Sequence, residues 1–216
     1  MLRCLVPGRP APLDRFGTAE YIARLRRFNA SANYLADLKR VVELLQPFTG
    51  MKVLDFGCGL GAASSALAAL GCVVTGADAN GNLLEAAARE HPRVVFKRDD
   101  ALPREQDAAI ALHVLSYVPN VPDTLNRIYG ALRAGGRIVF CEPNPLFALA
   151  MLPRNLFNDY LADENVVYCR SYSAWPRVLR RAGFTGIQGE TYGEFPSFPK
   201  NRALRSRVIF TARKVG

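Results

Sequence analysis

The chain lacks the features that would make it a metalloprotein or a disulfide-rich secreted protein. It has two histidines and five cysteines among 216 residues, and no two cysteines are spaced as a Cys-x-x-Cys pair. Zinc sites and disulfide frameworks depend on such spacings. We therefore expect reduced thiols packed as small hydrophobic side chains, and no metal ion.

Long apolar runs are missing as well. No run approaches the roughly 20 residues that a membrane-spanning helix needs. The segment Met1–Gly8 is broken by Pro7-Gly8 before the apolar stretch of a signal peptide could form. The expectation is a cytoplasmic protein without a transmembrane segment, although contact with a membrane surface stays open. Internal repeats and low-complexity tracts are also absent, so the length fits one domain over residues 1–216.

Negative charge is scarce, above all near the C-terminus. The formal net charge is +9, and after position 169 only Glu190 and Glu194 oppose the basic side chains. These basic residues are Arg170, Arg177, Arg180, Arg181, Lys200, Arg202, Arg205, Arg207, Arg213 and Lys214. Two interpretations stay open: a solvated basic face, or attraction to phosphate groups of RNA, a nucleotide-sugar, a lipid-linked substrate or a membrane.

The hydrophobic pattern predicts alternating helices and strands. Two N-terminal segments, near 18–28 and 34–45, carry apolar residues at helical spacing. The expected strands that follow are Lys52–Phe56, Cys72–Ala77, Val94–Lys97, Ala108–Leu112 and Arg137–Cys141, and the expected helices between them are Ala62–Leu70, Asn82–Glu90 and Pro122–Leu132. Such alternation predicts parallel βαβ units with helices on both faces of the sheet.

The C-terminal part departs from this alternation. After an expected helix at Ala174–Ala182, the segments Thr185–Thr191 and Val208–Arg213 both look like strands, with no helix between them. The simplest arrangement is an antiparallel hairpin closed by the loop Tyr192–Ser206. We therefore predict an α/β fold with a Rossmann-like, seven-stranded, mostly parallel sheet and a terminal antiparallel strand. Residues 1–47 would form helices that cap a substrate, and residues 48–216 the cofactor-binding core and hairpin.

A glycine-rich turn marks the candidate ligand site. The first expected strand runs directly into Gly57-Cys58-Gly59-Leu60-Gly61, and a helix follows at once. Glycines at alternate positions permit a sharp turn and close approach of a ligand, and the helix adds free N–H groups. Asp78 ends the second strand, where an acidic residue can bind ribose hydroxyls. These residues predict a ligand site beyond the carboxyl ends of the strands.

From about Leu38 to Pro145 the chain resembles the class I S-adenosylmethionine (SAM)-dependent methyltransferases, particularly the small-molecule type related to quinone-biosynthesis enzymes. The resemblance rests on Val53-Leu54-Asp55-Phe56-Gly57-Cys58-Gly59-Leu60-Gly61 and on Leu132-Arg133-Ala134-Gly135-Gly136. It implies SAM as the cofactor and S-adenosylhomocysteine as the product. The residues that it implies for SAM binding are Asp55, Gly57, Cys58, Gly59 and Gly61 at the amino-acid end, Asp78 at the ribose, Ala79, Asp100 and Ala101 near the adenine, and His113 facing the methyl donor.

The catalytic residues have weaker support, since Ser116-Tyr117 stands where the family frequently has a histidine pair. We hypothesise that His113 accepts a proton from the methyl acceptor and that Tyr117 helps to position it, because histidine titrates near neutral pH. Wall packing is the alternative for His113, and helix capping is the alternative for Asp78. Asp99 and Asp100 could also be ordinary loop carboxylates.

Three functions compete. The first is methylation of oxygen or carbon in a small-molecule or lipid- or sugar-linked acceptor, recognised by the N-terminal helices, an apolar patch at 146–152 and an aromatic wall at 195–199. The second is RNA methylation through the basic C-terminal face; against it, no Asn-Pro-Pro-Tyr-like tetrapeptide follows the fourth strand. The third is a non-catalytic SAM-binding protein, against which the intact Gly57–Gly61 turn and Asp78 argue.

Overall fold

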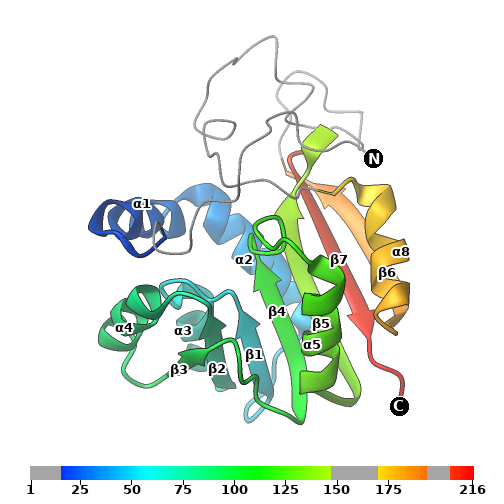
Figure 1. Ribbon diagram of the computed structural model, residues 1–216, viewed down its shortest axis with the longest axis horizontal. Coiled ribbons are helices and arrows are strands. Elements are labelled where there is room, and N and C mark those ends of the chain that lie inside the picture. The colour runs from blue at the N-terminus through cyan, green and yellow to red at the C-terminus, as the bar shows by residue number, and fades with distance from the viewer. Residues whose placement is uncertain (1–15, 147–169, 194–204) are drawn as a thin grey trace.

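The computed structural model describes residues 16–146, 170–193 and 205–216. Seven strands form one sheet in the order β3-β2-β1-β4-β5-β7-β6, with helices on both faces (Figure 1). The strands are β1 (Lys52–Phe56), β2 (Val73–Asp78), β3 (Val95–Arg98), β4 (Gln106–Leu112), β5 (Leu132–Pro143), β6 (Thr185–Tyr192) and β7 (Arg207–Arg213). The helices are α1 (Ala19–Asn29), α2 (Ala32–Leu45), α3 (Ala62–Ala69), α4 (Gly81–Glu90), α5 (Val121–Ala131), the 3-10 helix η2 (Tyr172–Ala174) and α8 (Trp175–Arg181).

Strand pairing confirms the predicted fold class. β1 to β5 pair in parallel, β7 joins β5 antiparallel, and β6 joins β7 antiparallel. The chain therefore ends in the expected hairpin at one edge of the sheet. The order of the strands reverses between β1 and β4, and in such sheets the crevice beyond the carboxyl ends at this point is where ligands bind.

The predicted start of the fifth strand was wrong. β5 begins at Leu132 rather than Arg137, because Leu132 already pairs with Gln106 of β4. The register then shifts before Arg137 pairs with Ala108. The pair Gly135-Gly136 consequently lies within an irregular part of the strand and does not precede it.

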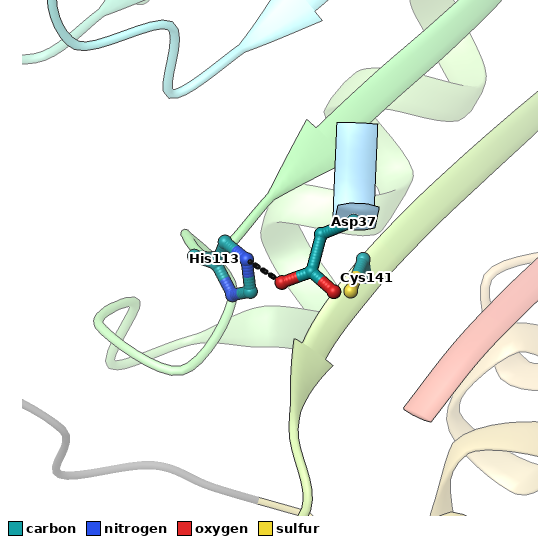
Figure 2. A group of neighbouring side chains, drawn as sticks. All are labelled: Asp37, His113 and Cys141. Carbon is teal, nitrogen blue, oxygen red and sulfur yellow. Dashed lines mark hydrogen bonds and ion pairs between the residues drawn. The ribbon is translucent and has the colours of Figure 1, made fainter. Parts of the chain in front are cut away.

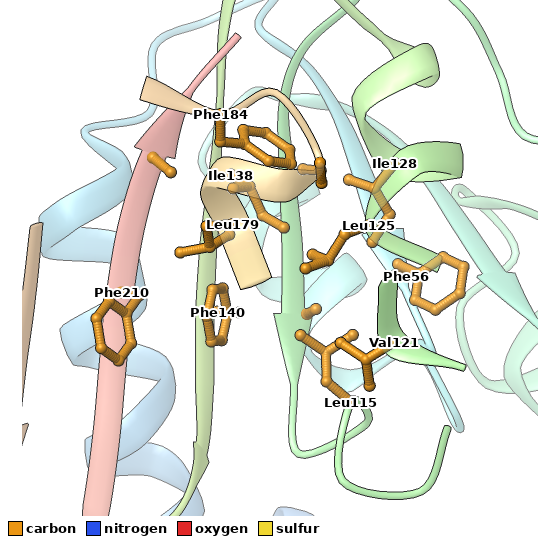
Figure 3. Close-up of a cluster of buried hydrophobic side chains, with 14 of the residues drawn as sticks. Phe56, Leu115, Val121, Leu125, Ile128, Ile138, Phe140, Leu179, Phe184 and Phe210 are labelled. Carbon is orange, nitrogen blue, oxygen red and sulfur yellow. The ribbon is translucent and has the colours of Figure 1, made fainter. Parts of the chain in front are cut away.

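The sheet separates two hydrophobic layers, because successive side chains of a strand point to opposite faces. On one face Leu54 and Phe140 pack with α5 and α8. Figure 3 shows Phe140 in the same cluster as Leu125 of α5 and Leu179 of α8. On the other face their neighbours Val53 and Val139 pack with α2 and α3. The helices on both faces bury large side chains, including Leu45, Leu67, Leu125, Trp175 and Leu179. Each such side chain stabilises the fold by roughly 1.5–3 kcal/mol, so both layers hold the strand ends rigidly.

The two N-terminal helices differ in their relation to the core. α2 is capped by Ser31, whose hydroxyl accepts the N–H of Tyr34, and it buries an apolar stripe against the sheet. α1 buries none of its residues fully, and its apolar side rests on Leu60 and Leu83. α2 is therefore a core helix. The predicted role of residues 1–47 as a substrate cap stays a prediction, and α1 is the helix at the edge of the site.

Two expectations from composition can be compared with the described residues. Cys58, Cys72 and Cys141 are free thiols, and the last two are buried. Cys4 and Cys169 lie outside the described ranges. Within those ranges, no helix combines the length and apolar character needed to cross a membrane.

Candidate active site

A cavity of about 980 Å³ lies at the carboxyl ends of the central strands. Its walls come from the turn after β1, the ends of β2 and β3, the segment after β4, and α1 and α2. The lining includes Phe28, Tyr34, Asp55, Gly57, Cys58, Gly59, Asp78, Ala79, Asp99, His113, Tyr117 and Arg207. Most of the residues expected from the sequence therefore share one cavity.

The glycine-rich turn after β1 contributes to this cavity through Gly57, Cys58 and Gly59. Gly57 has a φ of +72°, and a Cβ there would lie 2.1 Å from Cγ2 of Val114. Gly61 has a φ of +75° at the start of α3, and a Cβ there would lie 2.5 Å from the ring of Phe96. Gly61 is absent from the described cavity wall. Position 61 requires a glycine because the backbone there packs closely against Phe96 of β3.

Asp78 holds this turn to the end of β2. One carboxylate oxygen accepts the N–H of Gly59 at 2.9 Å, and the other accepts the N–H of Asn80 at 2.9 Å. Burial raises the pKa of Asp78, although these two hydrogen bonds oppose the shift. The cap of α4 is Asn80, whose side chain accepts the N–H groups of Asn82 and Leu83. Asp78 is therefore not the capping residue of that helix, and its carboxylate lies in the cavity wall.

Asp55 is the most deeply buried carboxyl group among the residues that line the cavity. It accepts a hydrogen bond of 2.5 Å from the hydroxyl of Ser64 on α3. Burial raises the pKa of Asp55 to about 6, and the nearby charge of Asp78 adds to the increase. A cationic ligand in the cavity would stabilise the ionised form of both carboxyl groups.

The two acidic residues after β3, Asp99 and Asp100, lie in different environments. Asp99 lines the cavity, and its N–H donates to the carbonyl oxygen of Asp78 at 3.1 Å. Asp100 and Ala101 are exposed and do not belong to the described cavity wall. Asp99 also pairs with Arg127 at 3.6 Å. The sequence alone could not decide which of two adjacent carboxylates faces the site, because that depends on how β3 ends.

His113 follows β4 with a φ of +54°, an uncommon conformation for a residue with a side chain. Its Nε2 lies 2.9 Å from Oδ2 of Asp37, a residue of α2 (Figure 2). The Phe28 ring meets the imidazole edge to face at 5.6 Å. His113 therefore joins the cavity wall to the buried side of α2.

Asp37 was not identified from the sequence. Its carboxylate accepts hydrogen bonds from Tyr192 at 2.6 Å and from Nε of Arg207 at 2.8 Å. Burial alone would raise the pKa of Asp37, but the hydrogen bond from His113 and the charge of Arg207 hold it below the ordinary value. A signal was present: Asp37 falls within the apolar stripe of α2, between Tyr34 and Val41. An acid on such a face is rare unless it is paired.

Cys141 lies beside this group, with its sulfur 3.0 Å from the Tyr192 hydroxyl. Ligand atoms of Asp37, His113 and Cys141 lie within 4.8 Å of one another, a spacing that could suit a metal ion. Two features oppose that use: the guanidinium of Arg207 already neutralises Asp37, and burial raises the pKa of the Cys141 thiol well above its ordinary value. The donor set thus fits a hydrogen-bond network better than a cation site.

Glu142 is a second residue that sequence reasoning missed. Its buried carboxylate accepts the N–H groups of Val114, Leu115 and Ser116 at 3.0, 2.7 and 3.1 Å. Burial raises the pKa of Glu142, and the electrostatic interaction with His113 and the hydrogen bonds from Leu115 and Ser116 oppose the increase. The carboxylate fixes the segment after β4, which is a turn and not a helix. His113 and Tyr117 both line the cavity, on either side of this turn.

The remaining expectations concern the acceptor. Tyr21, Phe28 and Tyr34 line the cavity, with the last two rings 5.5 Å apart. The apolar patch after Leu146 and the aromatic wall at 195–199 lie outside the described residues. Part of the basic C-terminal excess has internal partners: Arg207 bonds to Asp37, and Lys214 donates to the carbonyl oxygens of Tyr129 and Leu132.

Comparisons with known proteins agree with this architecture. The family model of a methyltransferase domain matches residues 23–188. A demethylmenaquinone methyltransferase of Clavibacter sepedonicus is 31% identical over 168 residues, which cover 66% of this chain and 69% of that protein. A ubiquinone biosynthesis O-methyltransferase of Paramagnetospirillum magneticum is 33% identical over 138 residues, or 60% of this chain and 53% of that protein.

Two solved structures share the fold at low sequence identity. Phosphoethanolamine N-methyltransferase 2 of Haemonchus contortus, in complex with SAM, has a TM-score of 0.71 at 16% identity and covers 94% of this chain and 60% of its own. A SAM-dependent methyltransferase of Mesorhizobium loti has a TM-score of 0.66 at 23% identity and covers 86% of this chain and 99% of its own. At these identities the likeness concerns the fold.

Proposed function

The chain belongs to the class I SAM-dependent methyltransferases, and from this premise we propose that its cavity binds SAM at the glycine-rich turn and a small methyl acceptor under α1. The observation that carries the proposal is the meeting of the Gly57–Gly59 turn with the Asp78 carboxylate in one wall. A ribose with two hydroxyl donors is the complement of such a carboxylate.

The charges of the cavity support this orientation. The carboxyl groups of Asp55, Asp78 and Asp99 lie at the ends of neighbouring strands, whereas Arg24 and Arg27 come from α1. SAM carries a sulfonium and an amino group, and both positive charges suit the carboxylate side. Among adjacent acids we assign the adenine contact to Asp99 rather than Asp100, because only Asp99 lines the described cavity. Cys58 and Ala79 would complete the cofactor wall.

The bound cofactor supplies an activated methyl group, so the protein mainly aligns the acceptor and excludes water. Phe28, Tyr34 and Tyr117 would hold a partly apolar acceptor against this group. His113 would take the proton that a hydroxyl or an acidic carbon must lose. The names of the two curated relatives favour an acceptor similar to demethylmenaquinone or to a ubiquinone precursor. We therefore propose transfer to oxygen or carbon of a small-molecule or lipid-linked acceptor.

RNA is the weaker acceptor class. Arg207 and Lys214 place their charges on internal partners, which removes them from the basic face that an RNA backbone would need. If the remaining basic residues only solvate the surface, RNA affinity should be weak and fall steeply with salt. Sequence-selective RNA binding that survives physiological salt would reverse this order.

The test has two parts. Calorimetry should detect binding of SAM and S-adenosylhomocysteine but not of NAD. Mass spectrometry should then detect the gain of one methyl group after incubation with SAM and a panel of hydroxylated quinone precursors, simple phenols and enols. Tight NAD binding without SAM binding would contradict the cofactor assignment, and methylation confined to RNA would contradict the acceptor class.

A further inference from the structure

The Asp37 carboxylate accepts hydrogen bonds from three other parts of the fold. Oδ1 accepts the Tyr192 hydroxyl of β6 at 2.6 Å, and Oδ2 accepts Nε of Arg207 on β7 at 2.8 Å. Oδ2 also lies 2.9 Å from Nε2 of His113, after β4. The side chain of Asp37 is 4% exposed, and that of His113 is 11% exposed. A carboxylate in this position has little freedom to change partners.

This geometry specifies which nitrogen of His113 carries the proton. An ionised carboxylate can only accept hydrogen bonds, so Nε2 must donate. In the neutral ring the lone pair then lies on Nδ1. Within the described residues Nδ1 makes no hydrogen bond, and His113 lines the cavity. In Figure 2 the Nε2 edge of the ring faces Asp37, with the other nitrogen directed away from the carboxylate.

We propose that Asp37 is a positioning residue that holds His113 as the Nε2–H tautomer and leaves Nδ1 to accept the proton of the methyl acceptor. The inference rests on the proposed function. In the step, the O–H bond of the acceptor breaks and its proton moves to Nδ1. The oxygen lone pair forms the new bond to the methyl carbon, and the electron pair of the broken carbon–sulfur bond goes to sulfur. The products are a methyl ether, S-adenosylhomocysteine and a protonated His113, so charge is conserved.

Arg207 offsets the negative charge of Asp37 beside His113. An isolated carboxylate beside His113 would favour the imidazolium and leave the ring without a lone pair for the reaction. Arg207 shares the same oxygen at 2.8 Å and offsets that attraction. The titratable and charged groups around the ring come from four elements: Tyr34 and Asp37 of α2, Cys141 and Glu142 of β5, Tyr192 of β6 and Arg207 of β7. The Glu142 carboxylate is bound by the amides after β4 and also interacts electrostatically with the ring.

The ring state can be measured directly because the chain has only two histidines. The full chain, labelled with 15N-histidine, carries His91→Gln and is saturated with S-adenosylhomocysteine. Imidazole nitrogen shifts followed against pH should report a neutral ring protonated at Nε2. In Asp37→Asn the Nδ1–H tautomer should become populated, because the uncharged amide no longer requires Nε2 to donate. A wild-type ring protonated at Nδ1, or an Asp37→Asn variant with an unchanged tautomer, would overturn the proposal.

Kinetics give a second readout with any acceptor that the panel identifies. His113→Asn should lower kcat by about a hundred- to ten-thousand-fold. Asp37→Asn should produce part of that loss, and the double variant should lose no more than His113→Asn alone, because the two residues act as one unit. Asp37→Glu, which keeps the charge, should recover part of the rate. Multiplicative losses in the double variant would mean that Asp37 acts independently of His113.

The matched control is Tyr192→Phe, which removes a hydrogen bond to Oδ1 and leaves the His113 contact in place. It should lower thermal stability with a smaller loss of kcat than Asp37→Asn, and equal losses in kcat would show that Asp37 serves only the packing of α2. If Asp37→Asn does not fold, the wild-type tautomer still decides the matter. If no acceptor is methylated, the proposed function fails while the ring measurement stands.

Discussion

The two halves of the cavity are built in different ways. The cofactor half comes from contiguous strand ends: a glycine-rich turn after β1, Asp78 at the end of β2 and Asp99 after β3. The acceptor half is assembled from α1, α2, the turn after β4, and β7, which are far apart in the sequence. One half therefore depends on backbone geometry and the other on long-range side-chain contacts around Asp37. Substitutions in the cofactor half should lower SAM affinity, and substitutions in the acceptor half should lower turnover.

The largest effect is expected in the cofactor half, at Gly59. Gly59→Val places a branched side chain within the glycine-rich turn at a φ of +52°, with its Cβ 3.2 Å from Cδ2 of Leu25. SAM binding should be abolished in calorimetry. The matched control is Gly50→Val, where φ is +85° and nothing lies within 4 Å of the added Cβ. The control should lose stability to backbone strain of about 1–3 kcal/mol and keep SAM affinity. Equal SAM affinity in the two variants would show that the glycine-rich turn does not bind SAM.

A substitution in the acceptor half should lower kcat. His113→Ala should lower kcat by about a hundred- to ten-thousand-fold while SAM affinity stays near normal. His91→Ala is the control, since His91 lies outside the described cavity wall and should keep wild-type turnover. Steady-state kinetics with calorimetry on the same samples makes the comparison. Loss of SAM affinity in His113→Ala would assign His113 to the cofactor wall, and the boundary between the halves would move.

Asp55 should give the cofactor half a distinctive pH dependence. Its pKa of about 6 in the folded protein exceeds the ordinary value of 3.8, so the native state retains a proton that the unfolded chain releases. The stability from this group is present below about pH 4 and is lost as the pH rises through about 6, with a total of up to about 3 kcal/mol.

Denaturant unfolding of wild type and Asp55→Asn across pH 4–8 should therefore diverge, with the variant gaining relative stability as the pH rises. SAM affinity of the wild type should increase over the same range, because the cationic ligand favours the ionised carboxylate. Parallel stability curves for the two proteins would contradict the burial of an ionisable group at this position.

Asp78→Ala tests the ribose contact, and its expected effect on SAM affinity is smaller. The substitution removes an acceptor for the N–H of Gly59 as well as the ribose partner. SAM affinity should weaken by roughly 1–3 kcal/mol, the range for hydrogen bonds to a charged acceptor. Asp100→Ala is the matched control on an exposed carboxylate and should leave the affinity unchanged. A larger loss in Asp100→Ala than in Asp99→Ala would restore the adenine contact expected from the sequence.

The same division explains how far the sequence could be interpreted. The alternation of strands and helices, the terminal hairpin and the Gly57–Gly61 turn follow from local patterns: apolar periodicity, glycine spacing and the absence of a helix between the last two strands. The partners of Asp37 and Glu142 could not be assigned in this way, because they are distant in the chain, although the place of Asp37 within the apolar stripe of α2 was a local signal of a buried acid. Likewise, the choice between Asp99 and Asp100 depends on the exit angle of β3, which no local pattern specifies.

A crystal structure of the full chain with S-adenosylhomocysteine tests the central claim most directly. The account predicts ribose hydroxyls at Asp78, the adenine amino group near Asp99 and the homocysteine at Gly57–Gly59. The space between the ligand sulfur, His113 and Phe28 should stay open for the acceptor. A ligand bound outside this cavity, or one whose sulfur is turned away from His113, would contradict the division of the cavity into a cofactor half and an acceptor half.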